Sequence, residues 1–321
     1  MRVGIFRAGA YGDLLFASSV FKAYKDKGWH VTLIASLPSS TIVEHDPHID
    51  TLIQHDTSIK PEDLPAYWNN IAKDYDLFIN LSGSLECEIL QLPGQPTYDY
   101  PLSVRQKLYD INYLERTHLL SNLDHKPQIK FYPSTFEIIS TDEVRKQMGD
   151  KILAWVISGS SRHKINPHIN TYCANILKQT DAHIVIIGSP ESKAFAEALS
   201  GLDRVTFLTH LPIREQYTFV QRHVDVIVGP ETGIMVGMSH EPMKKIVLLS
   251  HSTHNMLTRD WINTTPIEAP IETLPCGGCC KFKLSDQDVQ LYEDTQYSCC
   301  QVLQPMHLAF ASAVETLGLR P

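Results

Sequence analysis

The sequence predicts an α/β protein built from two Rossmann-like units, each with a parallel, doubly wound sheet. Two observations support this prediction. Short apolar runs alternate with helix-like stretches, and this alternation passes along the chain twice. At 321 residues the chain also exceeds the ~250–300 residues at which single cores stop growing. We expect two successive units with a cleft between them.

The first half contains four strand signals and three helix signals. The strands are Val3–Phe6, Val31–Ala35, Thr51–Ile53 and Leu77–Leu81, and the helices are Leu14–Lys25, Pro61–Lys73 and Val104–Leu120. A looser segment, Ser121–Ser134, follows, and we place the linker between it and Gly149. The predicted domains are therefore residues 1–140 and 141–321.

The second half repeats the pattern. Its strands are Ile152–Ile157, His183–Ile187, Val205–Leu208, Val224–Val228 and Ile246–Leu249, with helices near Asn170–Lys178, Glu191–Leu199, Ile213–His223 and Gly233–Ser239. The segment from Trp261 to Pro275 is expected to be a structural wrap. The last helix, Pro305–Leu317, is amphipathic and is a candidate to pack back across the N-terminal domain.

Composition narrows the function classes. The net charge is −8 and no block of Lys or Arg is present, so general nucleic-acid binding is not expected. No apolar run reaches the ~18 residues of a membrane span. The N-terminus is already the first strand, with no secretory signal, so we expect a cytoplasmic protein. A position at the inner surface of the membrane is an alternative within that expectation.

A glycine-rich turn, Arg7–Asp13, follows the first strand, where open α/β sheets place their chemistry. Its glycines do not form the dinucleotide fingerprint G-x-G-x-x-G, and no acid closes the second strand, so a ligand other than NAD is favoured. Asp13 is the candidate functional residue of this turn. The alternative is an acid that only stabilises the first turn of a helix through the macrodipole.

A second turn, Gly229-Pro230-Glu231-Thr232-Gly233, follows a strand of the second half. The helix start after it offers N–H groups that can hold a diphosphate. Glu231 can accept hydrogen bonds from two vicinal ribose hydroxyls, because a carboxylate is an acceptor only. The alternative is an ordinary helix start with Thr232 as its N-cap.

These two turns, together with Ser158–Pro167, resemble glycosyltransferase family nine, the ADP-heptose lipopolysaccharide heptosyltransferases. The resemblance implies the GT-B fold, with residues 1–140 on the acceptor side and residues 141–321 binding a nucleotide sugar. The family usually has a Trp-Pro pair where this chain has Asn166-Pro167. It also commonly has a His after the T-G pair, where this chain has Ile234–Gly237.

The resemblance also implies roles for single residues. Asp13 is the expected catalytic base, giving inversion in a single displacement, and Lys164 is expected to offset charge on the leaving diphosphate. The donor-binding residues are Gly12, Ser160, Ser161, Lys164, Glu231, Thr232 and Gly233. No D-x-D motif is apparent, so no metal is expected to be required. The expected partners are a nucleoside-diphosphate sugar and a hydroxyl acceptor on a glycan, a glycolipid or another molecule.

Two features depart from the pattern expected for a heptose donor and a lipopolysaccharide acceptor: the missing His, and the lack of a dense basic surface for a phosphorylated acceptor. Two alternatives also stay open. One is a nucleotide-sugar epimerase of the UDP-N-acetylglucosamine 2-epimerase type on the same scaffold. The other is a non-catalytic protein that binds a nucleotide sugar.

Five of the seven cysteines lie in Cys276-Gly277-Gly278-Cys279-Cys280 and Cys299-Cys300. A C-x-x-C pair followed by a second cysteine pair after ~15–20 residues is zinc-ribbon spacing. We therefore predict a structural role for this cluster, with a structural zinc on Cys276, Cys279, Cys299 and Cys300 as one form of it. Disulfides compete with zinc here, although a cytosolic location disfavours them.

Overall fold

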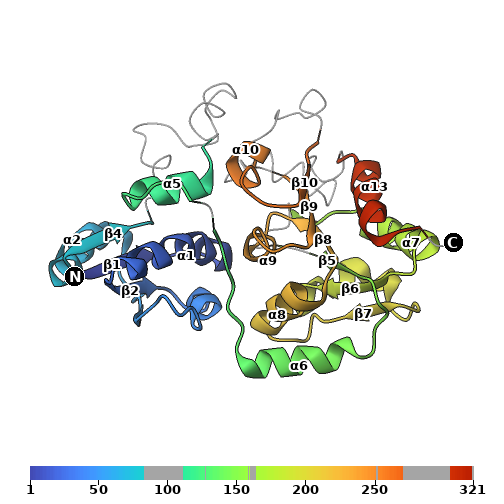
Figure 1. The fold of residues 1–321 in the computed structure, drawn as a ribbon, viewed down its shortest axis with the longest axis horizontal. Coiled ribbons are helices and arrows are strands. Elements are labelled where there is room, and N and C mark those ends of the chain that lie inside the picture. Colours follow the sequence, from blue (N-terminus) through green and yellow to red (C-terminus); the bar gives the residue numbers. More distant parts are fainter. Residues whose placement is uncertain are drawn as a thin grey trace. The chain divides into compact units, whose positions relative to one another are not determined.

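The computed structural model of the chain describes residues 1–82, 111–126, 128–157, 159, 164–250, 252–269 and 304–319. They form two compact units (Figure 1): residues up to 82 with 111–132, and the described residues from 133 onward. Both units are α/β with parallel sheets, so the predicted fold class is confirmed. No helix in the described part of the chain has the length and apolar character that crossing a membrane requires.

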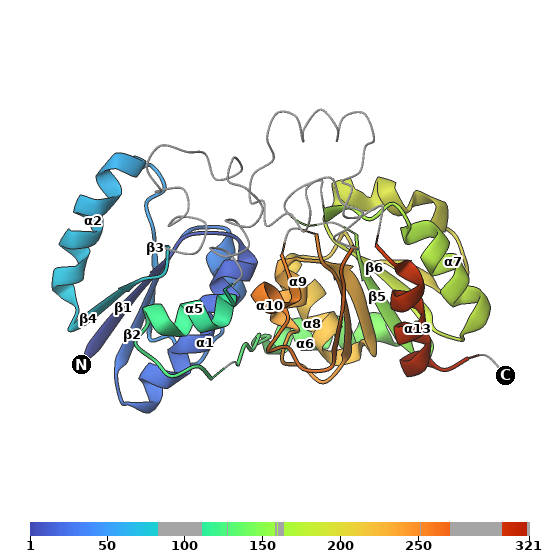
Figure 2. The ribbon, with the colours of Figure 1, turned by 90° about the horizontal axis from the view of Figure 1, so that it is seen from above.

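The first unit has a sheet of four parallel strands in the order β3-β2-β1-β4. Its elements are β1 (Arg2–Arg7), α1 (Tyr11–Asp26), β2 (His30–Ala35), η1 (Ser39–Val43), β3 (Thr51–Gln54), η2 (Pro61–Asp63), α2 (Leu64–Ile71), η3 (Ala72–Asp74), β4 (Leu77–Asn80) and α5 (Tyr113–Leu120), where η marks a 3-10 helix. Helices α1 and α2 lie on opposite faces of the sheet (Figure 2). On the α2 face, Phe6 packs edge-on against Tyr67 and Trp68, with ring centroids 6.3 and 5.6 Å apart.

The second unit has a sheet of six parallel strands in the order β10-β9-β8-β5-β6-β7. Its elements are α6 (Thr135–Arg145), β5 (Ile152–Val156), α7 (Ile169–Gln179), β6 (His183–Ile187), η6 (Pro190–Leu199), β7 (Val205–Phe207), α8 (Ile213–His223), β8 (Val226–Pro230), α9 (Gly233–Gly237), β9 (Lys244–Leu248), α10 (His254–Leu257), β10 (Thr264–Ile267) and α13 (Met306–Leu317). Helices α7 and α13 cover one face and α8 and α9 the other (Figure 2). Strands β5 and β6 are buried along their whole length, as expected of strands covered on both faces.

Helix α13 packs on the sheet of its own unit. Its small residues Ala309 and Ala313 are fully buried in one core with Trp155 of β5 and Ile267 of β10. The Tyr172 hydroxyl of α7 also donates a hydrogen bond to the Ala309 carbonyl at 3.0 Å. The described contacts of α13 therefore include the core of its own unit, and the packing on the N-terminal domain stays a prediction.

Helix α6 occupies the stretch in which the sequence analysis placed a linker. Ser134 and Glu137 form a capping box at its start. Glu137 also forms a buried two-point ion pair with Arg214 of α8, at 2.6 and 3.0 Å. Burial raises the pKa of Glu137, but hydrogen bonds from Arg214 and from the Ser134 N–H outweigh it and lower that pKa below its ordinary value. The whole of α6 therefore belongs to the second unit.

Strand β10 corrects the expectation of a structural wrap from Trp261 onward. Residues Thr264–Ile267 pair in parallel with β9 and add the sixth strand to the sheet. The signal was weak because the strand is short and contains Pro266, and proline is usually confined to edge strands. An edge position is where the structure places it.

The second unit also buries a lysine that the sequence analysis did not single out. Lys245 of β9 is 0% exposed, and its ammonium donates hydrogen bonds to the carbonyls of Glu241 and Met243 at 2.6 and 2.8 Å. Burial lowers the pKa of Lys245 from its ordinary 10.5 to about 8, against an opposing contribution from Glu241. The charged form is therefore less favoured in the folded protein than in the unfolded chain.

The burial of Lys245 makes the free energy of unfolding depend on pH in the alkaline range. Between pH 8 and 10.5 the unfolded chain holds more protons at Lys245 than the folded protein does, so stability rises with pH, by roughly 3 kcal/mol at ~1.36 kcal/mol per pKa unit. The neighbouring His240 stays neutral in this window, because burial and Lys245 lower its pKa to about 4. We expect urea unfolding of Lys245→Met to lose this rise relative to the unsubstituted protein. Parallel pH profiles of the two proteins would contradict the assignment.

Candidate functional site

Each sheet has one topological switch point, where the strand order reverses. One of the two predicted turns lies at the switch point of the first sheet and the other at that of the second. In the first sheet, the chain runs from β1 to β2 and β3 on one side and then places β4 on the other side of β1. In the second, it runs from β5 to β6 and β7 and then places β8 on the other side of β5. Loops that leave the carboxyl ends of two such strands diverge, and ligands of open α/β sheets bind in the resulting crevice.

In the first unit, Asp13 forms a partly buried ion pair with Arg7 at the end of β1. One carboxylate oxygen accepts a hydrogen bond from the Arg7 guanidinium at 2.5 Å, and the other accepts from the Ala10 N–H at 2.7 Å. Arg7 is itself buried and donates to the Leu81 carbonyl, just after β4, at 2.7 Å. The Asp13 side chain remains 27% exposed. The Asp13 carboxylate is therefore held in place by two donors and still reaches solvent.

The turn between β1 and α1 is shaped around this carboxylate. Gly9 has φ = 139°, and a Cβ there would lie 2.3 Å from an Asp13 oxygen, so only glycine fits. The loop after β4 also contacts this turn, because the Ala8 N–H donates to the Ser82 hydroxyl at 3.0 Å. The loops after β1 and β4 are thereby joined at the switch point.

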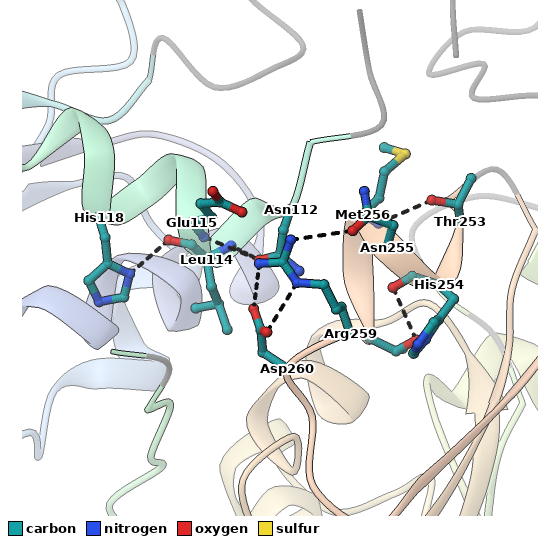
Figure 3. A network of polar contacts seen from close by, with 11 residues as sticks. Asn112, Leu114, Glu115, His118, Thr253, His254, Asn255, Met256, Arg259 and Asp260 are labelled. Carbon is teal, nitrogen blue, oxygen red and sulfur yellow. Dashed lines mark hydrogen bonds and ion pairs between the residues drawn. The ribbon is translucent and has the colours of Figure 1, made fainter. Parts of the chain in front are cut away.

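Helix α5 forms the wall beside Asp13. Its start is capped by Asn112, whose side-chain oxygen accepts from the N–H groups of Leu114 and Glu115 at 2.9 and 3.2 Å (Figure 3). A cavity of about 20 Å³ lies between α5 and Asp13, which is room for about one water molecule. Its lining residues are Arg7, Asp13, Phe16, Ala17, Leu81, Tyr113, Arg116, Thr117 and Leu120.

In the second unit, Lys164 reaches across the switch point from the loop after β5 to the turn after β8. Its ammonium donates a hydrogen bond to the Glu231 carbonyl at 2.7 Å. Gly159 lies against both loops, since a Cβ there would be 2.6 Å from Lys164 and 3.0 Å from Thr232. An ammonium has three donors, so Lys164 can hold the Glu231 carbonyl and still offer N–H groups to a ligand.

Thr232 takes the N-cap position of α9, but its side chain makes no capping hydrogen bond. Among the described residues, its hydroxyl is buried and has no hydrogen-bond partner. Buried hydroxyls are normally paired. The side chain of Thr232 is therefore not explained by helix capping, the alternative that the sequence left open.

The Glu231 carboxylate points into the protein and is 5% exposed. One oxygen accepts from the Ser250 N–H, from the Ser250 hydroxyl at 2.8 Å and from the Ser252 N–H at 3.3 Å. The other accepts from the Ser252 hydroxyl at 2.6 Å. One carboxylate oxygen thus has three donors and the other has one. Glu231 thus ties the turn after β8 to the loop after β9.

The loop after β9 leads into the short helix α10. Thr253 is its N-cap and accepts from the Met256 N–H at 3.1 Å (Figure 3). The Arg259 guanidinium then donates to Asn255 at 3.3 Å and to Asp260 at 3.2 Å. The loop that contacts Glu231 is therefore held at its far end by a compact polar turn.

The structure brings some predicted residues together and leaves others apart. Lys164, Glu231, Thr232 and Gly233 gather at the second switch point, whereas Asp13 and Gly12 belong to the first unit. Ser160 and Ser161 lie outside the described residues, as do the cysteines Cys276, Cys279, Cys299 and Cys300. Sequence reasoning did not assign roles to Arg7, Ser250 or Ser252. Of these three residues, only Arg7 could have been found from the sequence, because it is a cation at the end of an apolar strand.

Comparisons with known proteins give fold similarity without detectable sequence similarity. No protein-family model and no curated protein matches the sequence. The family 9 glycosyl transferase of Veillonella parvula DSM 2008 has a TM-score of 0.65 at 13% identity, covering 98% of this chain and 96% of that one. Escherichia coli ADP-heptose lipopolysaccharide heptosyltransferase II has a TM-score of 0.58 at 13% identity, covering 92% and 98%.

A third solved structure is E. coli heptosyltransferase WaaC with ADP-2-deoxy-2-fluoro heptose, with a TM-score of 0.56 at 14% identity, covering 92% of this chain and 100% of that one. This chain has the fold of the heptosyltransferases. The GT-B fold implied by the sequence resemblance is thereby confirmed. Fold alone does not carry an activity, so the function rests on the residues of the two switch points.

Proposed function

We propose that this protein is an inverting, metal-independent glycosyltransferase that moves a sugar from a nucleoside diphosphate, ADP-heptose-like by resemblance, to an acceptor hydroxyl. The observation that carries the proposal is the pair of polar sites at the two switch points. One holds a carboxylate, and the other holds an ammonium beside a buried hydroxyl that has no partner among the described residues. A base and a diphosphate site are the two groups that this reaction needs.

The proposal assigns activation of the acceptor to the first unit. Asp13 takes the proton of the acceptor hydroxyl as its oxygen attacks the anomeric carbon. Arg7 and the Ala10 N–H hold the carboxylate in one orientation, which a base needs when it takes a proton at a fixed point. The solvent-facing part of the carboxylate is the part that meets the acceptor.

The proposal assigns the donor to the second unit. The Lys164 stem and the Thr232 methyl group both lie against Gly159, and we assign the Lys164 ammonium and the Thr232 hydroxyl to the diphosphate oxygens. The charge on the leaving nucleoside diphosphate grows as the glycosidic bond breaks, and Lys164 stabilises that charge. Ser160, Ser161 and Gly233 complete the predicted phosphate contacts.

For Glu231 we propose a role in positioning. Glu231 is 5% exposed and its carboxylate already accepts from Ser250 and Ser252, so it presents little surface to a ribose hydroxyl. The direct ribose contact expected from the sequence therefore stays a prediction. The geometry favours Glu231 as the residue that fixes the Ser250–Ser252 loop.

Product analysis tests the proposal against its alternatives. The protein is incubated with ADP-, GDP-, UDP- and CMP-sugars, with and without a mixture of oligosaccharide acceptors, and the products are followed by mass spectrometry and NMR. A transferase releases the nucleotide and forms a new glycosidic bond of inverted configuration only with acceptor. An epimerase changes the sugar without acceptor. A binding protein produces neither.

Glu231→Gln tests the positioning role. The amide nitrogen of Gln cannot accept from the serine donors, so at least one buried donor loses its partner. We expect the free energy of unfolding to fall by about 1–3 kcal/mol, and nucleotide affinity to fall with it. Urea unfolding and calorimetry measure the two effects. A variant as stable as the unsubstituted protein would show that the carboxylate is not held as described.

A further inference from the structure

A pair of buried amide side chains joins the donor loops to the C-terminal segment. Asn166 is 2% exposed and Gln304 is 5% exposed. The Asn166 amide donates a hydrogen bond to the Gln304 side-chain oxygen at 2.8 Å. The two residues are 138 positions apart in the sequence, so this contact exists only in the folded protein.

Each amide also binds the backbone of a different loop. The Asn166 oxygen accepts from the His168 N–H at 2.8 Å, which closes the turn before α7. The Gln304 amide donates to the Leu249 carbonyl, at the end of β9, at 2.8 Å. The pair thus connects the loop after β5 with the loop after β9 through a residue just before α13.

These are the loops that carry the donor site. Lys164 lies two residues before Asn166, and Ser250, which binds Glu231, follows Leu249 directly. One link between the loops runs through Lys164 and Glu231 at the site itself. The Asn166–Gln304 pair is a second link beneath it, made entirely of buried groups.

The Asn166–Gln304 hydrogen bond favours one spacing between the two loops. In an apolar interior, an amide that loses its partner is costly, so each member of the pair depends on the other. Asn166 stands where the resembling family usually has Trp, and Gln304 gives it the partner that a buried amide requires. The pair fixes one spacing between the two loops, and any other spacing breaks a buried hydrogen bond.

We propose that Gln304 and Asn166 are positioning residues of the donor site, which hold the Lys164 loop and the Ser250 loop at the spacing that binds a diphosphate. The proposal rests on the proposed function of that site. Neither residue is assigned to touch the donor. Both act through Lys164, so their effect on binding should disappear when Lys164 is replaced.

The experiment measures binding of ADP, GDP and UDP by calorimetry to the full chain and to Asn166→Leu, Gln304→Leu and the double variant. The nucleotide that the unsubstituted protein binds is the probe. We expect each single variant to bind it about tenfold more weakly. The double variant should lose less than the two single losses added together, because both changes remove the same Asn166–Gln304 hydrogen bond.

Two further variants separate positioning from loss of stability. Thr180→Val removes a buried hydroxyl that binds the Ile176 carbonyl at 2.8 Å, at the amino end of β6 in the same unit, and should not weaken binding. Adding Gln304→Leu to Lys164→Met should cause little further loss, because the effect passes through Lys164.

The outcomes are distinct. Unchanged affinity in folded Gln304→Leu, or an equal loss in Thr180→Val, would overturn the positioning role while leaving the proposed function in place. Failure of the unsubstituted protein to bind any of the nucleotides would contradict the proposed function, and the positioning role would fall with it.

Discussion

Replacing Asp13 by Asn is expected to lower the rate of sugar transfer by about 10²- to 10⁴-fold, because the amide cannot take the proton of the acceptor hydroxyl. Binding of the nucleotide should be nearly unchanged, since the donor is assigned to the second unit. Steady-state kinetics and calorimetry on the same preparation check both expectations. The change also removes the partner of buried Arg7, so the variant's unfolding must be measured alongside.

Asp50→Asn is the matched control for this variant. Asp50 also pairs with a cation, Lys25, and accepts from the Val31 N–H at 2.8 Å, but it lies at the amino end of β3. It should lose some stability and keep its activity. Near-normal turnover of Asp13→Asn with an identified donor and acceptor would remove Asp13 as the base.

Replacing Lys164 by Met is the second large expected effect. Methionine keeps the unbranched stem that packs beside Gly159 and removes the ammonium. Because charge on the leaving diphosphate develops toward the transition state, kcat should fall by about 10²- to 10³-fold, as for loss of an oxyanion donor. The affinity for the nucleotide should fall less.

Lys151→Met provides the comparison within the same unit. Lys151 forms an exposed ion pair with Asp225 at 3.4 Å, at the amino end of β5, and should retain full activity. Equal small losses of kcat and affinity in both lysine variants would mean that the second switch point does not hold the leaving group.

Much of the fold could be predicted because its strands are buried on both faces. Parallel strands covered by helices are continuous apolar runs, so β5 and β6 were found to within a residue of their observed ends. Helix α6 was missed although Ser134 and Glu137 carry the capping-box signature. Its apolar pattern is weak, since α6 packs on α8 largely through ion pairs and its Phe136 and Ile139 are exposed.

The candidate site was predictable only where one turn contains its residues. Glu231 follows β8 directly and Asp13 lies in the first turn of the helix after β1, so the carboxyl edge of the sheet could be assigned to them. The partners of these carboxylates could not be found in the same way. Ser250 and Ser252 reach Glu231 through strand register and loop packing, and no local pattern in the sequence marks a serine as the partner of a distant glutamate.

The most direct test of the account is the melting temperature of the protein with ADP-, GDP-, UDP- and CMP-sugars, measured beside Lys164→Met. A ligand at 100 times its Kd stabilises the folded state by about 2.7 kcal/mol. The account predicts that one nucleotide class raises the melting temperature of the unsubstituted protein and raises that of Lys164→Met less. If no nucleotide sugar shifts either protein at millimolar concentration, the second unit is not a donor site and the account is wrong.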